Sequence, residues 1–260
     1  MQRFDDDDLD EAREDVGFLV RNLLHSQCTL AHAGRYCEAI VEAQRGVALL
    51  ELLLHADAAV FADELAVGAY ARRHFLRRCA KSSFADHYTC ASRADGLFAA
   101  LAAGQLGLAR EIGALSPAGP RANEEYEEDF WYARFLFAML EPLAPAPILK
   151  ELERSLEGEG SARLDVCKAL AARDPAALDE ALEALLEVHA EDVANERLGP
   201  AQEEAGRAAA THVFVEGLAL LQLAGHLGIE TRAEYPFCPA IARVPRDRPA
   251  PADELPEVTP

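Results

Sequence analysis

The chain has a single tryptophan, two methionines and, before Pro117, no proline. A proline inside a helix removes a backbone hydrogen bond and clashes with the preceding turn, so its absence leaves residues 1–116 free to form long helices. Valine, isoleucine and threonine are scarce, whereas alanine, leucine, glutamate and arginine, which favour helix, are abundant. No run alternates apolar and polar residues as a half-buried strand does. The sequence therefore predicts an all-α protein.

The N-terminus lacks the basic start and apolar run of a signal peptide, because four aspartates follow Phe4. No uncharged apolar stretch reaches the roughly 18 residues that span a bilayer. The six cysteines contain no CxxC pair and no dense framework, so we expect free thiols in a reducing compartment. These absences predict a cytoplasmic protein without a membrane segment.

Positive charge is also in short supply, since 25 basic residues stand against 45 acidic ones, a formal net charge of −20. Such a chain repels phosphates, which argues against nucleic-acid binding and fits a basic protein partner or plain solubility. Half of the residues are hydrophobic, so the chain has enough material for a sizeable core.

Caps and apolar periodicity predict about nine or ten mostly antiparallel helices, arranged as a bundle or a short superhelix. We expect Gly34 to separate the first two helices, and Asn123 to cap a helix that ends at Leu140. The other expected helices lie near 58–80, 90–103, 106–115, 148–156, 162–172, from 175 onward, and 203–227.

Residues 163–189 resemble one tetratricopeptide-type helical hairpin, although the pattern does not recur at a fixed period. We expect a single domain over residues 9–243. Residues 1–8 are predicted to be an acidic flexible N-terminus, and residues 244–260 a proline-rich flexible tail, because neither end carries a periodic apolar pattern.

Five acids gather where the helix ending at Leu140 should begin: Glu124, Glu125, Glu127, Glu128 and Asp129. They fit a solvated first turn in which the helix dipole favours negative charge, or a surface that binds a basic partner. A catalytic carboxylate pair is the least favoured interpretation, because no histidine or glycine-rich loop accompanies them. We take these five as candidate partner-binding residues.

The chain lacks a nucleophile elbow, a phosphate loop, a dinucleotide fingerprint and an HExxH motif. We therefore predict no enzymatic activity, no catalytic residue and no cofactor. One basic patch opposes the overall charge and is expected to pair with acidic helices of the same molecule. It consists of Arg72, Arg73, Arg77, Arg78 and Lys81.

His25, Cys28 and His32 are spaced to share one helical face and could bind zinc, but ordinary boundary residues explain them better, so no metal site is predicted. His212 and Glu216 are four residues apart on the expected last helix, as in half of a metal or acid–base site. We expect them instead to form a narrow solvent-exposed face of that helix together with Gln222 and His226.

Four segments in the second half of the chain together resemble the immunity protein 49 family of bacterial polymorphic-toxin systems. They are Glu125–Phe137, Arg163–Leu170, Val213–Leu223 and Tyr235–Arg243. The resemblance runs over about 123–243 and lies in the order and overall pattern of the segments, so it transfers no binding residue.

The resemblance implies an all-α cytoplasmic protein that binds and neutralises a cognate toxin. Many toxin domains of such systems are nucleases with basic clefts, which an acidic protein would block. Two alternatives remain open: a helical-repeat scaffold for another partner, and an enzyme that reverses a toxin's modification. The sequence leaves the oligomeric state and the identity of the toxin undetermined.

Overall fold

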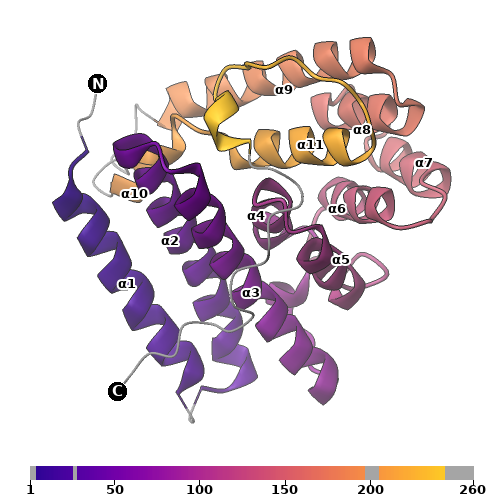
Figure 1. The fold of residues 1–260 in the computed structure, drawn as a ribbon. Helices are drawn as coiled ribbons and strands as arrows, with labels where there is room; N and C mark the ends of the chain where they lie inside the picture. The colour runs from indigo at the N-terminus through magenta and orange to yellow at the C-terminus, as the bar shows by residue number, and fades with distance from the viewer. Residues whose placement is uncertain (1–3, 26–27, 197–204, 244–260) are drawn as a thin grey trace.

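The computed structural model describes residues 4–25, 28–196 and 205–243, which form eleven α-helices, two short 3₁₀-helices and no β-strand (Figure 1). The predicted all-α fold is confirmed. The α-helices are α1 (Asp6–Leu24), α2 (Leu30–His55), α3 (Ala58–Ser82), α4 (Asp95–Ala102), α5 (Leu106–Leu115), α6 (Glu127–Leu140), α7 (Ala146–Ser155), α8 (Ala162–Ala172), α9 (Pro175–Glu196), α10 (Ala205–Ala210) and α11 (Val215–His226). The 3₁₀-helices are η1 (His87–Thr89) and η3 (Ala240–Ala242).

The first three helices are long and lie side by side, with α2 between α1 and α3 (Figure 1). Asp57 caps α3 by accepting hydrogen bonds from the backbone N–H groups of Ala59, at 2.9 Å, and Val60, at 3.0 Å. Ala56, with φ of 54°, ends α2 in the left-handed conformation and lets the chain reverse. Local capping therefore sets this turn.

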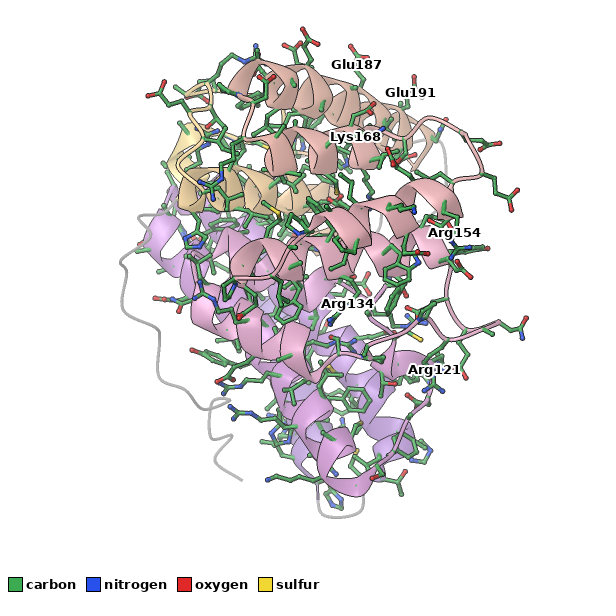
Figure 2. All side chains as sticks on the ribbon, turned by 90° about the vertical axis from the view of Figure 1, so that its right-hand side faces the viewer. Arg121, Arg134, Arg154, Lys168, Glu187 and Glu191 are labelled. Atoms are coloured by element: carbon green, nitrogen blue, oxygen red, sulfur yellow. The ribbon has the colours of Figure 1, made fainter. Side chains whose placement is uncertain are left out.

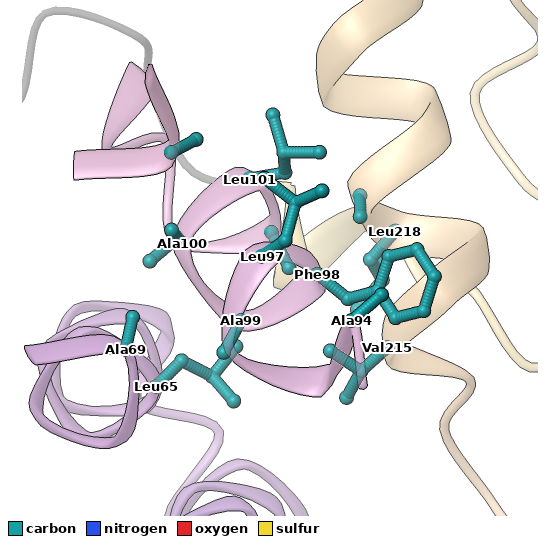
Figure 3. Close-up of a cluster of buried hydrophobic side chains, with 14 of the residues drawn as sticks. Leu65, Ala69, Ala94, Leu97, Phe98, Ala99, Ala100, Leu101, Val215 and Leu218 are labelled. Carbon is teal, nitrogen blue, oxygen red and sulfur yellow. The ribbon is translucent and has the colours of Figure 1, made fainter. Parts of the chain in front are cut away.

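Helix α4 is the centre of the molecule, because every residue from Gly96 to Ala102 is buried. It packs against α3 through Leu65 and Ala69 and against α11 through Val215 and Leu218 (Figure 3). The helices before and after α4 therefore share one core.

Gly34 does not separate two helices, contrary to our expectation. It lies inside α2, and a Cβ atom there would come within 2.5 Å of the Tyr88 side chain. Helix α1 ends ten residues earlier in the chain, at Leu24. The glycine is thus required by close packing against a distant segment, not by a turn.

The expected helix at 203–227 is also wrong, because α10 and α11 are separate helices. Thr211 donates its hydroxyl to the backbone oxygen of Ala208, and the backbone N–H of Phe214 donates to the oxygen of Phe237 at 2.8 Å. These bonds replace the helical ladder between the two helices. Asn123 caps no helix either, since it has φ of 64° in the preceding turn and Tyr126 occupies the N-cap of α6.

The chain ends fall partly outside the described residues. Asp5 caps α1, and α1 begins at Asp6, so the structure is helical where we expected part of a flexible segment at 1–8. Residues 1–3 and the predicted tail at 244–260 lie outside the described ranges. Helices α8 and α9 pack against each other across a short turn, while their tetratricopeptide-like character stays a prediction.

No helix in the described part of the chain is both long enough and apolar enough to cross a membrane.

Candidate functional site

A cleft of about 1010 Å³ opens between α1, α2 and α10, with the first turns of α4 and α11 at its floor. Phe98 from α4, Val215 from α11 and Val41 from the adjoining part of α2 give this floor an apolar surface. Helix α10 forms one wall because two glycines meet there. A Cβ atom on Gly206 would lie 3.0 Å from the Cα atom of Gly46, so the backbones of α10 and α2 touch only without side chains.

A charged network occupies the inner wall of the cleft. The Arg163 guanidinium on α8 donates two hydrogen bonds to the Glu216 carboxylate on α11, from Nε at 2.9 Å and from Nη2 at 2.7 Å. Its Nη1 atom donates to Asp129 on α6 at 3.0 Å. The Tyr132 hydroxyl donates to Oε1 of Glu216 at 2.8 Å. One arginine thus ties three helices together with bidentate geometry.

Burial changes the pKa values of the residues in this network. It raises the pKa of Asp129 above its usual value, although the neighbouring Arg163 pulls that pKa down. Burial, reinforced by the Glu216 charge, also raises the pKa of Tyr132 well above its usual value. Burial alone would lower the pKa of Arg163, but its hydrogen bonds to Glu216 raise it instead. The arginine therefore stays charged, and Tyr132 stays a hydrogen-bond donor.

Every other arginine in the cleft lining also has a carboxylate partner. Arg45 pairs with Asp95 at 3.2 Å, and Arg207 pairs with Glu42 at 3.0 Å. The guanidinium groups therefore offer little unbalanced positive charge to a ligand.

Three acids of α1 complete the cleft, namely Asp8, Glu11 and Asp15. Asp8 accepts a hydrogen bond from the backbone N–H of Asp5, whereas Glu11 and Asp15 have no partner within the described ranges. Seven carboxylates and three guanidinium groups thus line the cleft in the described structure, a formal charge of −4 with His189 neutral. A cationic group would be favoured here.

The five predicted acids come together at the start of α6, but most are already engaged. The Glu125 carboxylate accepts from the backbone N–H groups of Ser92, at 3.0 Å, and Arg121, at 2.9 Å. Glu124 pairs with Arg121 at 2.5 Å. In that pair the hydrogen bond from Arg121 lowers the pKa of Glu124.

Glu127 pairs with Arg154 at 3.2 Å, and Asp129 belongs to the Arg163 network. Figure 2 shows Arg121 and Arg154 on the same face of the molecule. Glu128 alone among the five has no partner in the described part of the chain. Tyr126 stands beside these acids with 74% of its surface exposed.

A second acidic surface follows the outer side of α9. Glu180, Glu187 and Glu191 are exposed at helical spacing, and none has an ion-pair partner among the residues that the structure describes. Figure 2 shows Glu187 and Glu191 pointing into solvent. These three residues lie outside the cleft lining.

The basic patch at 72–81 pairs within the molecule, as predicted, at two of its residues. Arg73 and Arg77 both contact Glu111, at 3.3 Å and 2.8 Å. Arg72 is buried and donates instead to the backbone oxygens of Tyr88 and Cys90. These three arginines therefore bind other parts of the same molecule, including the segment that follows α3.

The expected shared face of His25, Cys28 and His32 is wrong, because α1 ends at Leu24 and α2 begins at Leu30. Among the described residues no group of three or more histidines, cysteines or acids could hold a metal ion. His32 bonds to the Thr29 hydroxyl at 3.1 Å.

The prediction of a solvent-exposed polar face on the last helix is also wrong. Glu216 and Gln222 are each only 7% exposed, and His212 precedes α11. Glu216 is the residue whose importance was missed, because its partner Arg163 lies 53 positions away in the chain. A charged residue in an otherwise apolar helix was the signal that it needed a buried counter-charge.

A comparison with known families finds a match over most of the chain. A family model described as immunity protein 49 matches residues 28–242, which include the whole fold from the start of α2 to η3. No curated protein and no solved structure matches the chain.

Proposed function

The chain belongs to the immunity protein 49 family, and from this premise we propose that it neutralises a cognate toxin by forming a stoichiometric complex in the cytoplasm of the producing cell. The family match carries the proposal, because it spans the helices that build the core and most of the cleft. Toxin-neutralising immunity is what membership of this family indicates. What we propose beyond family membership is the stoichiometric binding, the cytoplasmic location and the type of toxin.

The toxin is proposed to present a basic surface, as a nuclease-type domain does. The chain carries a formal charge of −20, so it would attract such a surface over several ångströms and would repel nucleic acid. Complementary charge increases the rate of association, which suits a protein that must capture a toxin before it acts. No catalytic step by this chain is needed.

The first turn of α6 is proposed to form part of the contact. Tyr126 offers an exposed aromatic ring beside Glu127 and Glu128, and aromatic side chains are common anchors of protein interfaces. The five acids proposed here are Glu124, Glu125, Glu127, Glu128 and Asp129. Asp129 also lines the cleft, so this surface and the cleft adjoin.

Co-expression tests the function directly. The toxin domain encoded beside this chain is induced in a sensitive strain, with the chain, with a frame-shifted copy, or alone. We expect survival only with the intact chain, and a complex of one chain and one toxin domain by light scattering. Equal killing with and without the intact chain would refute the proposal. Protection without any complex would point to the enzymatic alternative, and a pull-down that yields only host proteins would favour a scaffold.

A second measurement tests the α6 contact alone. The double variant Glu127→Lys/Glu128→Lys keeps Glu125 and its backbone hydrogen bonds intact. We expect weaker toxin binding with unchanged helix content. Unchanged affinity would remove this surface from the interface and leave the immunity function standing.

A further inference from the structure

We propose that α1 selects the toxin, by lining the cleft with unpaired carboxylates that receive an arginine or lysine side chain from a basic loop of the toxin. The inference rests on the proposed immunity function and adds the site and the chemistry of recognition. It starts from the cleft of about 1010 Å³ described above, which is at the upper end of the size range of ligand sites.

The charge of the cleft divides between two parts of the chain. Glu42, Asp95, Asp129 and Glu216 come from residues that the family model matches, and each of them is bound to an arginine. The three α1 acids of the cleft, Asp8, Glu11 and Asp15, lie before residue 28, outside that match, and have no cation partner in the described structure. The charge available to a ligand therefore comes from α1.

The α1 acids share one side of the helix with an aromatic residue. Asp8, Glu11, Asp15 and Phe18 follow each other at spacings of three and four residues, which places them in one stripe. Phe18 is 58% exposed, so a large apolar side chain faces solvent at the end of this stripe. An acidic stripe that ends in an exposed ring matches a basic loop with an apolar neighbour.

The shape of the cleft fits a long cationic side chain. Val41, Phe98 and Val215 offer an apolar floor for methylene groups, and the α1 carboxylates stand at one wall for the charged end. Lysine and arginine side chains are amphipathic in this way, so one side chain would satisfy both parts of the cleft.

Helix α1 is held in place without a toxin. Leu9, Val16 and Val20 are buried against the rest of the molecule, Arg13 forms an ion pair with Glu51, and His55 contacts Asp6 at 3.1 Å. The wall of the cleft is therefore formed before binding, which reduces the entropic cost of association.

The test compares two double variants that change the charge equally. Glu11→Lys/Asp15→Lys reverses the unpaired acids of α1, and Glu187→Lys/Glu191→Lys reverses an exposed pair with the same spacing on α9. Binding of the neighbouring toxin domain to the wild type and to both variants is measured by surface plasmon resonance at 0.05 M and 0.3 M salt. Circular dichroism verifies that each variant keeps its helix content.

We expect the α1 variant to bind about a hundredfold more weakly than the wild type, and the α9 variant within about threefold of it. High salt should narrow the difference, because the lost interaction is electrostatic. An equal loss in both variants would show that only overall charge counts and would overturn the inference, as would an unchanged α1 variant. Failure of the wild type itself to bind would refute the proposed function, and the inference with it.

Discussion

The acids at the start of α6 and the acids on α1 look alike in the sequence, but their surroundings differ. Glu124, Glu125 and Asp129 are bound to arginines or to backbone N–H groups of the same molecule. Glu11 and Asp15 face the cleft without a partner in the described structure. Glu125 and Asp129 therefore stabilise the fold of their own molecule, whereas Glu11 and Asp15 remain available to another molecule.

The two acidic groups also differ in how the sequence presents them, and the role of the α6 acids in binding stays a prediction. The sequence pointed to α6 as the partner-binding surface and to residues 1–8 as a flexible end. In the structure the acids from Asp6 to Asp8 belong to a capped helix that borders a cleft. Clustering of charge is thus a poor guide to available charge, because the neutralising arginine is often distant in the chain.

The largest effect should follow from removing Arg163. The change Arg163→Met leaves Glu216 buried without its counter-charge, and we expect a loss of about 3 kcal/mol in the free energy of unfolding. Urea unfolding measures it. The matched control is Arg154→Met, whose ion pairs are exposed, so that its unfolding curve should match that of the wild type. Equal losses in the two variants would contradict a supporting role for the Arg163 network.

The next largest effect distinguishes the acids at the start of α6 by their contribution to stability. Glu125→Ala strips two backbone N–H groups of their acceptor, at a cost of about 2 kcal/mol in stability. Glu128→Ala removes a carboxylate without a described partner and should change stability by less than about 0.5 kcal/mol. Thermal unfolding of both variants verifies the difference. A stable Glu125→Ala protein would mean that this carboxylate is free for a partner after all.

Phe18 allows the α1 surface to be tested without changing charge. Because the residue is 58% exposed, Phe18→Ser should change stability little, but it should weaken toxin binding about tenfold. Isothermal titration calorimetry measures the affinity. Val188→Ser on α9, where the side chain is 48% exposed, is the control and should bind as the wild type does. Comparable losses at both positions would argue against an interface on α1.

The smallest expected effect is a pH dependence of the stability that His55 contributes by holding α1 against α2. Hydrogen bonds to Glu51 and then to Asp6 raise the pKa of His55 above its usual 6.5. A raised pKa stabilises the folded state fully below the usual value and loses that contribution as pH rises through the folded-state value. The stability difference between the wild type and His55→Asn should therefore be larger at pH 5.5 than at pH 9. A constant difference would show that the charge of His55 is immaterial.

Local signals predicted much of the fold. The expected helices at 106–115 and 162–172 match α5 and α8, and the helix expected from 175 onward begins at Pro175, where Asp174 accepts hydrogen bonds from the backbone N–H groups of Ala176 and Ala177. In these places a proline, a glycine or a capping side chain decides the boundary within a few residues. These boundary signals lie within a few residues of the boundary itself, so the sequence alone shows them.

The errors occurred where a distant residue decides the structure. Gly34 continues a helix because Tyr88 needs its space, and the break before α11 depends on a bond to Phe237. Glu216 is buried because Arg163 reaches it from another helix. None of these three contacts leaves a local signal that identifies the distant partner, so the site could not be assembled from the sequence alone.

The burial of α4 has a consequence for how a toxin would dock. Its first turn contributes Asp95 and Phe98 to the cleft, while the remainder is enclosed between α3 and α11. Because this floor is anchored in the common core, we expect α4 to keep its place when a ligand enters the cleft. We therefore expect single-exponential capture at a rate proportional to toxin concentration, without a slow second phase.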